Sequence, residues 1–144
     1  MKTTDEKILL VITKRALESA LESSRAVFPS EFIGLFRGRE TRTNRGTSVK
    51  LDELIIAPLS EYGEGFSSYS DVFLPLHLQA IATFHSHTAP PAVPSKGDLH
   101  FFSRKGKFHF IACPPFDWRV LAADYAPCVR AFNSRGSELE FRVV

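Results

Sequence analysis

The stretch from Phe84 to Asp98 limits what this chain can fold into more than any other part of its sequence. An apolar, strand-like run, Ala80 to Phe84, leads directly into His85-Ser-His87, and a turn rich in proline follows. Successive side chains of a strand point to opposite faces, so His85 and His87 share one face and the serine between them takes the other. Two imidazole donors on one face are half of a zinc site. The sequence therefore predicts a metal centre at the end of a strand.

A third ligand follows the turn. Asp98 lies in a helix-like stretch, Ser95 to Arg104, and the turn can bring its carboxylate back towards the two histidines. Three protein ligands, with a fourth position left for water, are typical of catalytic zinc sites, whereas structural sites use four. The spacing therefore favours a hydrolytic metal centre.

The same residues also fit a purely structural interpretation. Ser95 and Asp98 match a capping box, in which the serine accepts from the first helical turn and the aspartate returns a hydrogen bond near the positive helix end. His85 and His87 could be polar residues at a strand end. Because capping and metal binding are compatible, both interpretations stay open at this point.

The spacing resembles the signature of the JAMM (MPN+) metalloprotease domain. That signature reads His-x-His, seven residues and Ser-x-x-Asp, and residues 85 to 98 match it in residue type and spacing. The family also carries a glutamate that follows proline and precedes a short apolar run with glycine, and Pro29-Ser-Glu31-Phe-Ile-Gly34 is similar to that segment. Many members carry proline directly after the second histidine, where Thr88 stands here. The loop path is therefore expected to differ locally, with no ligand position affected.

The resemblance implies a zinc-dependent isopeptidase with one Zn²⁺ per chain. His85, His87 and Asp98 would be its ligands, Glu31 the general acid and base, and Ser95 the oxyanion donor. Zinc in such a set lowers the pKa of its water to near 7. A carboxylate in apolar surroundings, as we expect for Glu31 on a strand, is a better base than one in water. A hydroxyl aimed at the developing oxyanion contributes about 3 kcal/mol in other hydrolases.

The resemblance covers essentially the whole chain and implies one domain over residues 1–144. The implied fold is the α/β fold of JAMM (MPN) domains, which is cytidine-deaminase-like, with a mixed, curved β-sheet flanked by helices. The residue pattern predicts a helix that is capped by Thr13 and ends before Pro29. Its apolar stripe comprises Leu17, Ala20, Leu21, Ser24 and Phe28. The predicted strands are 31–39, 49–57, 80–85, 108–113, 119–125, 129–132 and 138–143, with the polar segment 40–48 as the loop of a hairpin.

The segment Tyr62 to Leu74 corresponds in position to the part of JAMM enzymes that grips substrate. In the family the substrate resembles an extended tail that ends in two glycines and is joined to a lysine amine, and such a tail can add to a sheet edge. The expected partners are therefore conjugates of ubiquitin-like modifiers, as for the stand-alone prokaryotic and archaeal members. A mobile connector is the alternative for this segment. The residues expected to contact the tail are Phe66, Ser67, Ser68 and Tyr69.

Other functions fit parts of the pattern. Processing of sulfur-carrier proteins, which share the diglycine tail, cannot be separated from deconjugation by sequence. A non-catalytic scaffold or interaction module of the same fold would be expected to lack ligands or the glutamate, yet all five residues stand here. A zinc nucleobase deaminase needs His-x-Glu and a Pro-Cys-x-x-Cys pair, while Cys113 has no second cysteine nearby. A deaminase is therefore disfavoured.

Composition excludes several broader classes. A chain of 144 residues with 44% hydrophobic and 24% charged residues is ordinary for a globular protein. The longest apolar runs are too short for a bilayer and the N-terminus is charged, so we expect a cytoplasmic location and no membrane partner. The oligomeric state stays open. Cys113 and Cys128 are expected to be buried, and whether they form a disulfide is also open.

The formal net charge of +2 is too small to indicate nucleic-acid binding. Arginines nonetheless gather around the polar segment 40–48, without aromatic side chains between them. This pattern predicts a solvent-exposed hairpin tip, and a docking patch for an acidic partner is the alternative. The residues concerned are Arg37, Arg39, Arg42 and Arg45.

Overall fold

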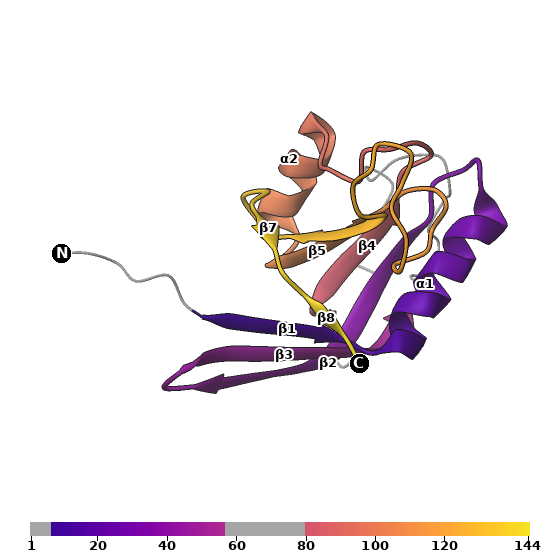
Figure 1. Ribbon diagram of the computed structural model, residues 1–144. Coiled ribbons are helices and arrows are strands. Elements are labelled where there is room, and N and C mark those ends of the chain that lie inside the picture. Colours follow the sequence, from indigo (N-terminus) through magenta and orange to yellow (C-terminus); the bar gives the residue numbers. More distant parts are fainter. Residues whose placement is uncertain (1–6, 57–79) are drawn as a thin grey trace.

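The computed structural model describes residues 7–56 and 80–144, which form one curled sheet with a helix on either side (Figure 1). The sheet order is β7-β6-β5-β4-β2-β3-β1-β8, and both parallel and antiparallel pairs occur. The predicted α/β fold with a mixed, curved sheet is therefore confirmed. Its elements are β1 (Ile8–Ile12), α1 (Lys14–Val27), β2 (Ile33–Thr43), β3 (Gly46–Ile55), β4 (Ala82–Ser86), α2 (Lys96–Arg104), β5 (Phe108–Ala112), β6 (Val129–Phe132), β7 (Glu138–Leu139) and β8 (Arg142–Val143).

The last two strands lie at opposite edges of the sheet although they are almost continuous in sequence. β7 pairs with β6, whereas β8 pairs with β1, and only Glu140 and Phe141 separate them. Phe141 crosses between the edges and packs against Phe110 of β5, with ring centroids 5.3 Å apart. The prediction of one strand over 138–143 is wrong in this respect, because the segment changes its partner halfway.

The N-terminal helix forms as its sequence predicts. The Thr13 hydroxyl accepts from the amide of Ala16, and the buried positions Ala16, Leu17, Ala20, Leu21 and Ser24 form one stripe. Phe28 does not belong to that stripe. It follows the last helical turn, is 49% exposed, and packs edge-on against Phe116 at 6.0 Å.

The hairpin of β2 and β3 is longer than predicted, because the polar segment expected as its loop is itself paired strand. Only Asn44 and Arg45 separate the two strands, and Gly46 follows with a φ of +133°. A register shift lies between Arg37 and Gly38, where a Cβ on the glycine would lie 1.8 Å from the carbonyl oxygen of Lys50. Glycine at this position therefore permits the close approach of the two strands.

The prediction of a strand over 119–125 is wrong. The Asp117 carboxylate accepts from the amide of Arg119 and Tyr125 has a φ of 63°, so this segment forms turns with one isolated bridge, Leu121 to Pro127. The loop joins β5 to β6 at Cys113 and Cys128, whose backbones are linked by a 2.9 Å hydrogen bond. Both thiols are buried, as predicted, and both are free.

The two faces of the central strands have different coverings. On one face, Phe36 contacts Phe84 and Phe110 edge-on, at 5.8 and 5.5 Å. The opposite face carries the alternate residues His85 and His109. Phe102 of α2 covers this second face and stacks on His109 with ring centroids 4.1 Å apart. Within 7–56 and 80–144 neither helix is long and apolar enough to cross a membrane.

His109 connects α2 to the sheet through both of its ring nitrogens. The Gly106 carbonyl, just after α2, can only accept, so Nε2 carries the proton of this 3.0 Å bond. Nδ1 is then free to accept from the Thr83 hydroxyl at 2.7 Å. Because the ring is fully buried, burial lowers the pKa of His109 to about 4. His109 is thus a neutral packing residue.

This buried imidazole predicts an acid-sensitive fold. Between its ordinary pKa of 6.5 and its native pKa of about 4, the unfolded chain binds a proton that the native ring refuses. Stability is therefore expected to fall as the pH drops through that window, by up to about 3 kcal/mol from this residue. Urea unfolding midpoints measured across the window in chelator should show the decline, and His109→Gln should flatten it. A parallel decline in both proteins would exclude His109 as the source.

Candidate metal centre

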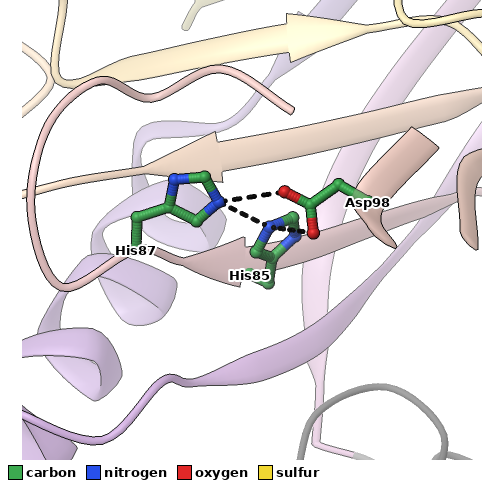
Figure 2. Close-up of side chains that lie close together, drawn as sticks. All are labelled: His85, His87 and Asp98. Carbon is green, nitrogen blue, oxygen red and sulfur yellow. Dashed lines mark hydrogen bonds and ion pairs between the residues drawn. The ribbon is translucent and has the colours of Figure 1, made fainter. Parts of the chain in front are cut away.

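The end of β4 and the first turn of α2 bring His85, His87 and Asp98 together (Figure 2). The Nε2 atoms of the two histidines lie 3.2 Å apart. His85 Nε2 lies 3.2 Å from Oδ1 of Asp98, and His87 Nε2 lies 3.0 Å from Oδ2. His85 and Asp98 are 1% and 5% exposed, while His87 is half-buried. Within 7–56 and 80–144, no other group of three or more such side chains converges in this way.

These distances fit a zinc ion. Zinc bonds to nitrogen and oxygen are about 2.0–2.1 Å long in tetrahedral sites, which puts neighbouring donor atoms about 3.3 Å apart. The observed separations of 3.0–3.2 Å are close to that edge length. Two imidazoles and one carboxylate are also a donor set that zinc accepts, with one position left for water or substrate. The residues therefore fit the metal that the sequence predicts.

The surroundings of His87 set its tautomer for metal binding. Its Nδ1 lies 3.1 Å from the carbonyl oxygen of Pro91, which can only accept, so Nδ1 carries the proton and the lone pair of neutral His87 is on Nε2. The His87 amide also donates to the Ala112 carbonyl at 2.7 Å. Burial lowers the pKa of His87, but hydrogen bonds to Asp98 and Pro91 outweigh it and raise the pKa overall. A carbonyl partner of this kind is a common support for a metal-binding histidine.

Asp98 caps its helix and faces the histidines at the same time. Its Oδ2 accepts from the Ser95 amide at 2.9 Å, while the Ser95 hydroxyl accepts from the Asp98 amide at 3.1 Å. Burial raises the pKa of Asp98, yet hydrogen bonds from His85 and His87 outweigh it and hold this pKa well below its usual range. The carboxylate is therefore ionised at neutral pH. The capping and ligand interpretations of the sequence coexist in one side chain.

Glu31 lies beside this centre, although not on a strand as predicted. β2 begins two residues later, at Ile33, whose register partner is His85. The Phe32 amide is bonded to the Ser86 hydroxyl at 2.8 Å rather than to a strand carbonyl, and the Ser86 amide donates to the Phe32 carbonyl at 3.0 Å. Phe32, the next residue after Glu31, is thereby bonded to the residue between the two histidines. It is half-buried, and its charge contributes to the raised pKa of His87.

The Ser95 hydroxyl keeps its proton available. In the capping box its oxygen acts as the acceptor, so this interaction does not use the O–H proton. The structure thus brings Ser95, Glu31 and the three candidate ligands to one end of β4. The predicted tail contacts, Phe66, Ser67, Ser68 and Tyr69, lie outside the described residues.

Sequence reasoning missed the groups that support the ligands. The Ser86 hydroxyl bonds to Phe32, and the carbonyls of Pro91 and Ala112 bond to His87. Ser86 is the one with a sequence signal, because a polar side chain opposite two ligands on a buried strand needs a hydrogen-bond partner. The carbonyls have no such signal, because every residue carries one.

Comparison with known proteins gives consistent results. Residues 13–123 match the family described as prokaryotic homologs of the JAB domain. A probable metalloprotease of Haloferax volcanii is 34% identical over 115 residues, which are 76% of this chain and 70% of that protein. A JAB1/MPN domain protein of Archaeoglobus fulgidus is 30% identical, with a TM-score of 0.64 over 94% of this chain and 99% of its own.

Two further solved structures share the fold. One, described as JAMM, a metalloprotease-like zinc site in the proteasome and signalosome, is 31% identical with a TM-score of 0.65, covering 94% of this chain and 98% of its own. The other, a protein of Desulfitobacterium hafniense, is 20% identical with a TM-score of 0.64, covering 94% and 93%, and supports the fold alone. The matched family region contains every candidate site residue that the structure describes.

Proposed function

The chain belongs to the family of prokaryotic JAB-domain homologs, the JAMM metalloprotease-like proteins, and we propose that it is a zinc isopeptidase. It would hydrolyse the bond between the C-terminal glycine of a ubiquitin-like modifier and a lysine amine. The observation that carries this proposal is the convergence of His85, His87 and Asp98 with Glu31 beside them. Three ligands leave one metal position open for water, and a base beside that position suits hydrolysis.

His85, His87 and Asp98 would hold the metal, and Glu31 would move the proton. A bound zinc ion supplies an acidified water and polarises the scissile carbonyl. The Glu31 carboxylate, within electrostatic reach of His87, would accept a proton from the attacking water and pass it to the leaving amine. The tie between Phe32 and Ser86 fixes the backbone of the base relative to both histidines. Holding the base in a fixed position lowers the entropic part of the activation barrier.

Ser95 would stabilise the oxyanion that develops on the carbonyl. Ser95→Ala is expected to lower the rate about a hundred- to a thousandfold, the usual effect of losing one such donor. It also removes the acceptor for the Asp98 amide, which is expected to cost about 1 kcal/mol of stability. Turnover and urea unfolding should be measured together. Ser95→Asp, whose ionised carboxylate restores a capping acceptor but has no donor, is the control: recovery of stability without recovery of rate supports a direct chemical role.

The proposal is tested with two substrates that share one diglycine tail. A ubiquitin-fold modifier is linked either to a lysine side chain or, as a linear fusion, to a backbone amine, and each is incubated with the protein, with chelator, and with zinc restored. Cleavage of the lysine conjugate that chelator stops and zinc restores is the expected result. Preferential cleavage of the linear fusion would favour the alternative of precursor processing. Cleavage in full chelation would contradict the mechanism, and absence of cleavage with zinc bound would favour a non-catalytic scaffold.

A further inference from the structure

A row of basic side chains crosses the exposed face of the hairpin half of the sheet. Arg39 of β2 is the register partner of Lys50 of β3, Lys50 is paired with Val11 of β1, and Val11 is paired with Arg142 of β8. Register partners on neighbouring strands share a face, so the four side chains form one line across the sheet. We call Arg39, Lys50 and Arg142 the basic row. All three are exposed.

The basic row lowers the stability of the fold, and no ion pair within the described residues offsets this effect. Two like charges directly opposite each other, as Arg39 and Lys50 are, destabilise a strand pair. None of the three cations forms an ion pair within the part of the chain that the structure describes. Among the acids near the row, Glu40 pairs with Lys107 and Glu53 pairs with Arg37. Asp52 and Glu140 are exposed, and within the described residues neither forms an ion pair with the row. An uncompensated row of this kind is complementary to an anionic partner.

The residues around the row favour a protein over a nucleic acid. Val11 lies within the row and Leu9, next along β1, is 46% exposed, which gives the cations an apolar border. The other exposed neighbours, Thr41 and Ser48, offer hydroxyls and no ring on which a base could stack. The net charge of +2 is also small for a phosphate-binding protein. Mixed apolar and cationic side chains are typical of protein interfaces.

The row lies on the same face of β2 as the metal centre. Ile33 is the register partner of His85, and Ile33 and Arg39 are six residues apart on one strand, hence on one side of it. At about 3.3 Å per residue they are about 20 Å apart, a span that about six extended residues of a tail can bridge. In Figure 1, β1, β2 and β3 run together away from the end of β4 that holds the histidines. A globular body on the row would therefore leave its tail in reach of the metal.

We propose that the basic row, with Leu9 and Val11, is a docking surface for the acidic face of a protein. Arg39 and Lys50 stand on strands about 5 Å apart and suit neighbouring carboxylates, and Arg142 stands two strands, about 10 Å, beyond Lys50 and takes a third. If the docked partner is the globular body of the substrate, that identification rests on the proposed function. The proposal that an acidic protein docks on the row does not depend on the proposed function.

The test measures binding without turnover. A fluorescein-labelled glutamate-rich peptide and a labelled single-stranded oligonucleotide of equal charge are titrated with the protein at low and moderate salt, and anisotropy is recorded. The row variant is R39Q/K50Q/R142Q. The matched control is K14Q/R104Q/R135Q, which removes the same charge from exposed positions elsewhere. Because the variant relieves a like-charge pair, its thermal midpoint should equal or exceed that of the wild type.

We expect the peptide to bind the wild type in a salt-dependent way, the row variant to bind at least about tenfold more weakly, and the control to stay within about twofold. Equal weakening in both variants would overturn the proposal, because net charge alone would then explain binding. Absence of peptide binding, or a row-dependent preference for the oligonucleotide, would overturn it as well. If the protein cleaves no conjugate, the proposed function is wrong, but the binding of the acidic peptide to the basic row is unaffected.

Discussion

Replacing Glu31 by glutamine is expected to lower the rate of conjugate hydrolysis about a hundred- to ten-thousandfold while zinc binding stays unchanged. Glutamine has nearly the same shape, but its amide cannot accept the proton of the attacking water. Glu31 is not among the three converging ligand side chains, so the metal should be retained. Its backbone neighbour Phe32 keeps both hydrogen bonds to Ser86, so the fold should be unaffected. Turnover of the lysine-linked conjugate and bound zinc are measured on the same preparation.

Glu22→Gln is the matched control, because Glu22 is exposed on α1. This variant should keep the wild-type rate and zinc content. If Glu31→Gln cleaves as fast as the wild type, the carboxylate is not the base. If it loses zinc together with activity, the residue belongs to the metal site itself and its assignment as a proton carrier is wrong.

Asp98→Asn is expected to lower zinc affinity by more than about a hundredfold and to abolish hydrolysis, yet to leave the metal-free fold nearly intact. The amide oxygen of asparagine can still accept from the Ser95 amide, and its NH₂ group can donate to a histidine nitrogen. What it lacks is the negative charge of the carboxylate, which makes a much stronger zinc ligand than a neutral amide oxygen. Competition with a chromogenic chelator gives the zinc affinity, and urea unfolding in chelator gives the stability.

Asp98→Ala separates the two functions of this side chain. It removes the helix cap as well as the ligand, so metal-free stability should fall by about 1 kcal/mol more than in Asp98→Asn. Similar zinc loss with different stability is the expected pattern. Zinc affinity of Asp98→Asn close to that of the wild type would show that Asp98 acts as a cap alone.

The metal centre could be predicted from the sequence because its geometry is local. Strand alternation places His85 and His87 on one side, and the capping box fixes Asp98 within one helical turn of Ser95. The turn between β4 and α2 therefore has to bring the aspartate back over only a short distance to reach the histidines. The supporting hydrogen bond from His87 to Pro91 was not predictable, because it depends on the path of the backbone through that turn.

The errors in the predicted secondary structure have a different cause. They arise because strand pairing depends on segments that are distant in sequence. The polar residues 40–48 predict a loop, but pairing between β2 and β3 continues to the tip of the hairpin. This is possible because polar residues suit strands that are exposed on one face. The 119–125 segment contains residues that favour strands, but within residues 7–56 and 80–144 its one pairing contact is the bridge from Leu121 to Pro127. The sequence predicts Glu31 on a strand because the apolar run begins directly after it.

The division of residues 138–143 between the two edges has a consequence for how this protein assembles. β6 and β1 each have an outer neighbour only because the last strands of the sheet supply one, and the Val144 amide and carbonyl extend the link to Ile12 and Lys14. Until this segment docks, both strands present unpaired backbone to other molecules. The same few residues therefore protect both borders of the sheet, and a chain in which they are not docked is open to wrong edge-to-edge association.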